Sequence, residues 1–168
     1  MSERAVVLRI DTEDFISPDS NDALLAIAQL LTRHGLRATF PLVGEKFRFL
    51  KRSGRDDVLH ALGKHAVGYH SNTHSIHPTI AEELADCGWK DGVDRFVRRE
   101  QPGVDDLIEW LGSPPICYTQ PGANWVPQSM AALRRWGIPF YFGESWNAYV
   151  RTFDQPMVYG GCLYWAPE

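Results

Sequence analysis

The sequence contains few cysteines, and their spacing matches no metal-binding or disulfide motif. The three cysteines, Cys87, Cys117 and Cys162, are odd in number and lie far apart. A zinc ribbon needs closely spaced pairs, and a disulfide framework needs an even set at short intervals. We therefore expect reduced thiols that are partly buried.

The chain also lacks a membrane-spanning run and a secretion signal. No apolar stretch approaches the roughly 20 residues that cross a bilayer. Residues 1–4 lead directly into the first apolar run, without the hydrophobic region or the small-residue cleavage site of a signal peptide. These absences predict a cytoplasmic protein with no membrane partner.

Basic residues are not concentrated in any part of the chain. The 17 lysines and arginines are scattered, and the net charge is −4. Proteins that bind nucleic acid usually carry a basic stripe, often with aromatic side chains between the charges. No such stripe occurs here, so we expect no nucleic-acid partner.

The chain does have the composition of an ordinary globular protein. Its 168 residues are 44% hydrophobic and 23% charged, which suffices for one domain with a buried core. We predict a single domain over residues 1–168. Aromatic residues are abundant, with six Trp, six Tyr and eight Phe. We expect most of them in the core, while exposed rings could serve a sugar-binding cleft.

Apolar runs that predict strands alternate with segments of helical periodicity. The expected strands cover residues 5–10, 37–43, 66–69, 116–119, 138–142, 149–153 and 157–165. The expected helices cover residues 23–34, 45–51, 56–64, 78–85, 93–111 and 127–136. Strand and helix in repeated alternation predict a parallel α/β protein, either an open sheet or a barrel.

Several local features qualify this assignment. The first strand is apolar at nearly every position, as in a strand covered on both faces. Pro41 weakens the second strand, because proline has no N–H for the ladder. We expect a loop at residues 89–92, and we expect Pro102 and Gly103 to break the long helix after it.

Polar residues follow the predicted strands at the ends where parallel α/β proteins collect their reactive groups. Because the carboxyl ends of parallel strands meet at one edge, we expect these residues to share one pocket. They are Asp11, Glu13, His70, His74, Gln120 and Glu144.

The histidines of this set, His70 and His74, are four residues apart. If the backbone between them is helical, both imidazoles point the same way and can bind one metal ion. Two histidines with one carboxylate form a catalytic set for a divalent metal that leaves positions open for water and substrate. A histidine pair alone is more often a surface or capping feature, and acidic residues before a helix often serve its N-terminus. The combination after two strands favours a metal site.

The carboxylates of the set lie in the stretch Asp11-Thr12-Glu13-Asp14. Asp11 and Glu13, two apart on an extended segment, would face the same side. One could bind the metal while the other takes the proton from a water molecule whose pKa the metal lowers toward ~7. This chemistry is metal-assisted hydrolysis of an acyl or amide group.

Four stretches resemble motifs of one family, the polysaccharide deacetylases (NodB-homology, carbohydrate esterase family four). His70-Ser71-Asn72-Thr73-His74 matches its metal motif, His-[Ser/Thr]-x-x-His, at every fixed position. The resemblance extends over roughly residues 5–142. The supporting stretches are residues 38–44, similar to Ala-Thr-Phe-Phe-x-x-Gly, residues 63–70, similar to Gly-His-Glu-x-Gly-x-His, and residues 8–14, similar to the Asp-x-Asp/Glu variant of the first motif.

The resemblance implies a fold, a cofactor and a reaction. The fold would be a distorted (β/α) barrel with fewer than eight strands. A divalent metal, foremost Zn²⁺, would be bound by His70, His74 and Glu13, with Asp14 as the alternative third ligand and Asp11 as the base. The substrate would be an N- or O-acetylated sugar or polysaccharide, or a related small amide.

Four further residues are candidates for substrate binding. Tyr69 and Trp125 flank the pocket segments, where they would either stack on a sugar or pack in the core. Gln120 lies in the third motif, and Glu144 follows the fifth strand, where family members often carry an acidic residue. The sequence predicts no particular oligomeric state.

The chain departs from the family in two places. The third motif usually contains an arginine that orients the base, but residues 119–125 contain none. Family members also present a late histidine as general acid, and no histidine follows His77. A chain truncated at its C-terminus, and hence an incomplete barrel, would explain the second departure. Two alternatives remain, a hydrolase of small non-sugar amides and a catalytically inactive metal- or glycan-binding module.

Overall fold

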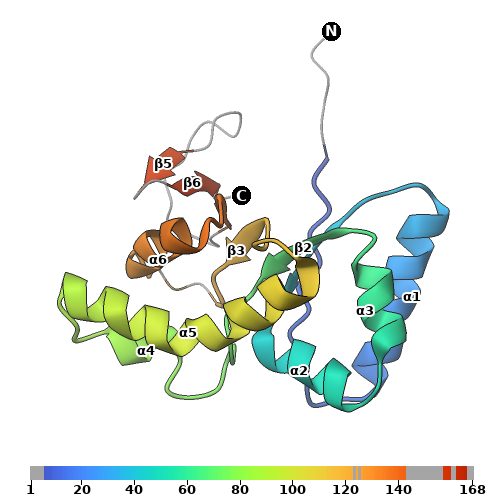
Figure 1. Cartoon of the computed structure of the whole chain (residues 1–168), viewed down its shortest axis with the longest axis horizontal. Helices are drawn as coiled ribbons and strands as arrows, with labels where there is room; N and C mark the ends of the chain where they lie inside the picture. The colour runs from blue at the N-terminus through green and yellow to red at the C-terminus, as the bar shows by residue number, and fades with distance from the viewer. Residues whose placement is uncertain (1–5, 123, 125, 143–156, 160–161, 166–168) are drawn as a thin grey trace, which may run out of the picture.

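A sheet of six strands lies at the centre of the computed structural model, which describes residues 6–122, 124, 126–142, 157–159 and 162–165 (Figure 1). The strand order is β1-β2-β3-β4-β6-β5. All neighbouring pairs are parallel except β5 and β6, which are antiparallel. The strands are β1 (Thr39–Leu42), β2 (Ala66–Tyr69), β3 (Cys117–Thr119), β4 (Phe140–Phe142), β5 (Met157–Tyr159) and β6 (Cys162–Trp165).

Helices connect β1 to β2, β2 to β3 and β3 to β4, as the sequence predicts. In Figure 1, α1 and α3 lie side by side, and α5 packs against both α2 and α6. The helices are α1 (Asp19–Arg33), α2 (Gly44–Arg52), α3 (Asp56–Leu62), α4 (Ile80–Leu84), α5 (Trp89–Leu111) and α6 (Gln128–Trp136). Among the described residues, none of these helices combines the length and the apolar character that crossing a bilayer requires.

The prediction that residues 5–10 form a regular strand covered on both faces is wrong. Residues 8–14, the N-terminal segment, join β1 only through isolated parallel bridges at Arg9 and Thr12. Val6 and Val7 are 83% and 63% exposed, so this end is not covered on both faces.

Proline explains why the ladder beside β1 is interrupted. Within β1, the N–H and C=O of Thr39 and the C=O of Pro41 all bond to the N-terminal segment, at 2.8 to 3.0 Å. Pro41 has no N–H to donate toward the same neighbour, so one bond of the ladder is missing. The segment still runs beside β1, and it delivers Asp11 and Glu13 to the carboxyl end of that strand.

Helix α5 differs from the prediction at its start and in its middle. Residues 89–92 form its first turn instead of a loop, and Pro102 and Gly103 do not divide it. Pro102 removes one backbone hydrogen bond from a helix of 23 residues. The buried face of α5 includes Phe96, Val104 and Leu107, which are all fully buried. Their packing outweighs the free-energy cost of the missing hydrogen bond.

The C-terminal end also differs in detail. Residues 157–159 and 162–165 form two antiparallel strands, β5 and β6, where the sequence predicts one strand over 157–165. The strand expected at residues 149–153 lies outside the described residues.

A row of tyrosines marks the helix-covered face of the sheet. Tyr69, Tyr118 and Tyr141 are register neighbours on β2, β3 and β4, and all three are fully buried. Neighbouring ring centroids are 5.8 and 5.6 Å apart, and Tyr118 also contacts Phe96 of α5. Because side chains alternate along a strand, the residue after Tyr69 points away from this layer, and that residue is His70.

Candidate metal centre

Three side chains from separate parts of the sequence meet at the carboxyl end of the sheet. One donor atom each of Glu13, His70 and His74 lies within 4.8 Å of the other two. Glu13 Oε2 lies 2.8 Å from His74 Nε2 and 3.4 Å from His70 Nε2. Donors about 2.1 Å from a tetrahedral Zn²⁺ lie about 3.4 Å from one another. The distance from Glu13 to His70 has this value and the distance from Glu13 to His74 is shorter, so small side-chain adjustments would fit the three atoms around one zinc ion.

The histidines converge through a turn and not through a helix. In the histidine loop (residues 70–74), Ser71 and His74 have positive φ angles of 64° and 50°. The Ser71 hydroxyl accepts a hydrogen bond from the His74 backbone N–H at 2.8 Å. The two imidazole centroids are 4.8 Å apart. The predicted convergence of the two rings is thus present, although the backbone that produces it is not helical.

His70 is held in one tautomer by the neighbouring strand. Its ring is 2% exposed, and its Nδ1 lies 2.9 Å from the backbone carbonyl of Thr119. A carbonyl can only accept, so Nδ1 carries a proton, and Nε2 is the ring nitrogen that faces Glu13. When Nε2 carries no proton, its lone pair faces the Glu13 carboxylate at 3.4 Å, and a metal ion between the two atoms would make this contact favourable. This arrangement fits a bound metal ion.

The electrostatics also favour the ligand forms of these groups. The contact with His70 lowers the pKa of Glu13, although partial burial opposes the shift. Burial, and then the neighbouring His70, lowers the pKa of His74. These lowered pKa values favour the anionic carboxylate of Glu13 and the neutral imidazole of His74, which are the forms that bind metals.

Asp11 lies next to this cluster, and Arg9 contacts it. Asp11 and Glu13, together with Asp14, line a hollow of about 190 Å³ that neither histidine reaches, and the charge of Asp11 acts to raise the pKa of His74, against the net lowering. Arg9 Nε lies 3.5 Å from Asp11 Oδ1. The third motif lacks an arginine, but Arg9 of the N-terminal segment supplies a guanidinium group beside Asp11. The signal was available in the sequence, because Arg9, like Glu13, is two residues from Asp11 on extended chain.

Asp14, the alternative third ligand, has a different position. Its Oδ1 accepts hydrogen bonds from the backbone N–H groups of Ser17 and Ile16, both at 2.9 Å, and these bonds lower the pKa of Asp14. The residue shapes the turn before α1 and does not belong to the cluster with the histidines.

A buried lysine that the sequence interpretation missed anchors this turn. Lys46 of α2 is 1% exposed. Its ammonium donates to the Asp14 backbone carbonyl, the Ser20 hydroxyl and the Asn21 side-chain oxygen. Three acceptors satisfy all three of its N–H groups, while burial lowers its pKa. Lys46 therefore fixes the segment that carries Glu13.

Of the four predicted substrate-binding residues, the structure describes two. Tyr69 is fully buried, and its hydroxyl donates to Glu100 of α5. Gln120 is 2% exposed, and its side-chain oxygen accepts from the Tyr118 hydroxyl. Both side chains therefore belong to the packed interior. Trp125 and Glu144 lie outside the described residues.

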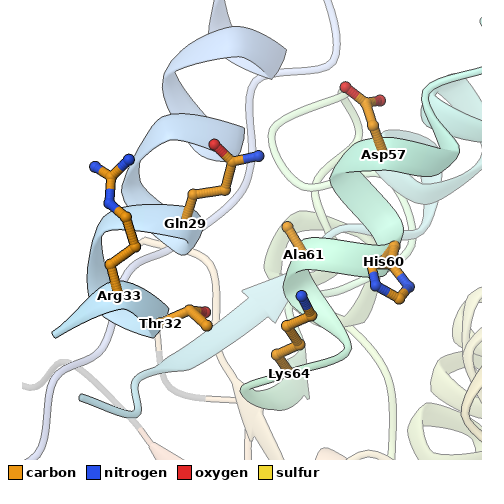
Figure 2. Close-up of a pocket in the computed structure, with 7 residues that line it drawn as sticks. All are labelled: Gln29, Thr32, Arg33, Asp57, His60, Ala61 and Lys64. Atoms are coloured by element: carbon orange, nitrogen blue, oxygen red, sulfur yellow. The ribbon is translucent and has the colours of Figure 1, made fainter. Parts of the chain in front are cut away.

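A second hollow, of about 230 Å³, lies elsewhere between α1 and α3 (Figure 2). Figure 2 shows Gln29 and Arg33 of α1 on one side and Asp57 and His60 of α3 on the other. None of its lining residues belongs to the cluster of Glu13, His70 and His74.

Comparison with solved structures places this fold among deacetylases. A proposed polysaccharide deacetylase from Mycobacterium smegmatis matches with a TM-score of 0.61 and 15% identity, over 95% of this chain and 56% of that one. A CE4 family pseudoenzyme from Bacillus anthracis matches with a TM-score of 0.56 and 19% identity, over 80% and 41%. A family 4 carbohydrate esterase from Streptomyces lividans, solved in complex with acetate, gives 0.52 and 19%, over 80% and 59%.

These matches confirm the predicted fold class. The chain is an α/β protein with the barrel-like fold of CE4 deacetylases, and six strands lie within its described residues. It spans about half the length of the solved structures that it resembles. No protein-family model and no curated protein sequence matches it.

Proposed function

We propose that this chain is a metal-dependent hydrolase of the polysaccharide deacetylase family, in its Asp-x-Asp/Glu variant. It would remove an acetyl group from an N- or O-acetylated sugar or polysaccharide, with residues 1–168 as one catalytic domain. The observation that carries the proposal is the cluster of Glu13, His70 and His74 with Asp11 beside it. The fold that it shares with a carbohydrate esterase and a proposed deacetylase supports the same reaction.

Each residue of the site has a chemical task in this proposal. Glu13, His70 and His74 would hold a divalent metal, foremost Zn²⁺, which when bound lowers the pKa of water and polarises the substrate carbonyl. Asp11 would take a proton from the attacking water, because it is the nearby carboxylate that is not committed to the histidines. Arg9 would orient the Asp11 carboxylate through their contact.

The test is zinc loading followed by measurement of acetate release from chitooligosaccharides. We expect one zinc ion per chain and release of acetate from the zinc-loaded protein. A protein that stays free of metal under conditions that preserve metal sites would overturn the metal hypothesis.

A second candidate is an inactive metal- or glycan-binding module. It is favoured by one observation in the sequence, that no histidine follows His77 to donate a proton to the leaving group. This candidate predicts bound zinc without acetate release. Acetate release from chitooligosaccharides would exclude it. Turnover of small non-sugar amides, with no turnover of acetylated sugars, would point to the third alternative, an amide hydrolase.

A further inference from the structure

The histidine loop rests on helix α5 through a buried glutamate. Glu100 of α5 is 0% exposed. Its Oε2 accepts hydrogen bonds from the backbone N–H of Asn72 at 2.7 Å and from the Tyr69 hydroxyl at 2.6 Å. These donors lie two residues after and one residue before His70. One carboxylate oxygen therefore fixes the chain on both sides of a predicted metal ligand.

Neighbouring residues of α5 extend this contact. The backbone carbonyl of Arg99 accepts from the Asn72 side chain at 3.0 Å, and the Arg99 guanidinium donates to Thr73 Oγ1 at 3.1 Å. Gly103 leaves room for the loop, because a Cβ there would lie 2.7 Å from the Tyr69 hydroxyl and 3.0 Å from Asn72 Oδ1. The histidine loop and α5 are thus closely fitted.

The loop needs such support because of its backbone. Ser71 and His74 both have positive φ angles, which cost free energy in residues other than glycine and persist only where surrounding contacts enforce them. Asn72 lies between them. The hydrogen bond from its backbone N–H to Glu100 therefore holds the loop between the two residues with positive φ angles.

The burial of Glu100 is itself costly. Desolvation raises the pKa of its carboxyl group to about 7. An apolar side chain of similar size would fill the space without that cost. An apolar group could not accept hydrogen bonds, however, and would leave the Asn72 N–H and the Tyr69 hydroxyl without this partner. The function of Glu100 is therefore to accept these two bonds.

We propose that Glu100 is a positioning residue of the metal site, which holds the histidine loop in the conformation that brings the His70 and His74 imidazoles to one ion. The inference rests on the proposed function, because it assumes that this cluster binds the metal. Glu100 itself touches neither substrate nor metal.

The test is metal affinity, measured without reference to turnover. Zn²⁺ dissociation constants would be determined by competition with a chromophoric chelator for the wild type, Glu100→Ala and Glu100→Gln, and Co²⁺ absorption would report the geometry of the site. We expect Glu100→Ala to bind Zn²⁺ about 10- to 100-fold more weakly, the range for residues that orient metal ligands, with a changed Co²⁺ spectrum. Glu100→Gln keeps an acceptor oxygen and should bind within about threefold of the wild type.

Two controls separate positioning from general damage. Glu109→Ala removes an exposed glutamate from the same helix and should leave the affinity unchanged. If Glu100→Ala does not fold, Glu100→Asp is measured in its place. The shorter side chain keeps a carboxyl group but moves its oxygens away from the Asn72 N–H and the Tyr69 hydroxyl. It should also weaken binding about tenfold or more.

The outcomes distinguish this inference from the proposed function. Wild-type affinity in the folded Ala or Asp variant would overturn the role of Glu100 while leaving the metal site intact. An affinity for Glu100→Gln as low as for Glu100→Ala would also overturn it, because hydrogen-bond acceptance would not be what matters. A wild-type protein without metal affinity would overturn the proposed function, and this inference with it.

Discussion

Both histidines of the candidate metal centre are held by contacts with neighbouring parts of the chain. His70 donates to the carbonyl of Thr119, which leaves its Nε2 facing Glu13. The turn that carries His74 is closed by the Ser71 hydroxyl. These partners are strand ends and loop atoms, so contacts within the protein itself direct both histidines toward Glu13.

The two histidines should be required for metal and not for the fold. We predict that His70→Ala and His74→Ala each weaken Zn²⁺ binding by at least about 100-fold, more than the loss of a residue that only orients a ligand. Metal content by mass spectrometry and circular dichroism would be measured together. His60→Ala, at an exposed histidine of α3, is the matched control and should keep its zinc. Full zinc occupancy in either of the first two variants would contradict the site.

Asp11 should be required for turnover and not for metal. We predict that Asp11→Asn keeps zinc and loses about 10²- to 10⁴-fold in kcat, the range for removal of a general base. Asp14→Asn is the control, because asparagine retains the oxygen that accepts from Ser17 and Ile16. It should retain most of the activity. Unchanged turnover in Asp11→Asn would remove Asp11 from the mechanism.

At the scale of elements, the sequence predicts best where a local pattern decides the outcome. The strand expected at residues 66–69 is β2 with the same bounds, because a short apolar run is followed by polar loop residues. Helix α1 ends just before Gly35, whose φ of +66° favours glycine. The start of α5 was missed, because Trp89, Lys90 and Asp91 are exposed and show no apolar periodicity that would indicate a helix.

Gly103 shows how two elements constrain each other. Glycine to alanine in a helix interior usually stabilises a protein by about 1 kcal/mol. Here the new Cβ would lie 2.7 Å from the buried Tyr69 hydroxyl, and overpacking costs about 1–3 kcal/mol. We predict that the clash outweighs the helix propensity, so that Gly103→Ala lowers the free energy of unfolding by about 1 kcal/mol and weakens Zn²⁺ binding.

Urea denaturation and chelator competition would measure both effects of Gly103→Ala. Gly88→Ala is the control, since a Cβ there meets nothing within 4 Å; it should lose some stability at the N-terminus of α5 but keep its Zn²⁺ affinity. A Gly103→Ala variant more stable than the wild type would show that the histidine loop moves freely away from α5.

At the scale of the whole molecule, the site is assembled from segments far apart in the sequence. The carboxyl ends of parallel strands meet at one edge of the sheet, and from this rule the approach of Glu13 to His70 and His74 could be predicted. The supporting residues could not be predicted. Glu100 and Lys46 bond to residues 28 and 32 positions away, and no local pattern indicates such a partner. Arg9 was the exception, because its spacing from Asp11 was visible.

Glu100 should make the stability of the whole protein depend on pH. Its pKa is raised to about 7 in the folded protein by burial, against opposing contributions from Tyr69, Asn72 and Arg99 and a reinforcing one from Glu83. The protonated carboxyl group is therefore favoured by folding. Its contribution to stability is fully present below the unfolded pKa of about 4.5, and is lost as the pH rises through about 7.

We predict that the wild type loses up to about 3 kcal/mol of unfolding free energy relative to Glu100→Gln between pH 5 and pH 9, since each pKa unit corresponds to 1.36 kcal/mol. Urea denaturation of both proteins across this range, with a chelator present, would measure the difference. The contributions of other titrating groups are the same in both proteins and cancel in the difference of their unfolding free energies. The prediction concerns how this difference changes with pH, and a difference that is the same at every pH does not test it. Parallel stability curves would show that Glu100 is ionised at little cost. The carboxylate would then have a better partner than its 3.7 Å contact with Arg99.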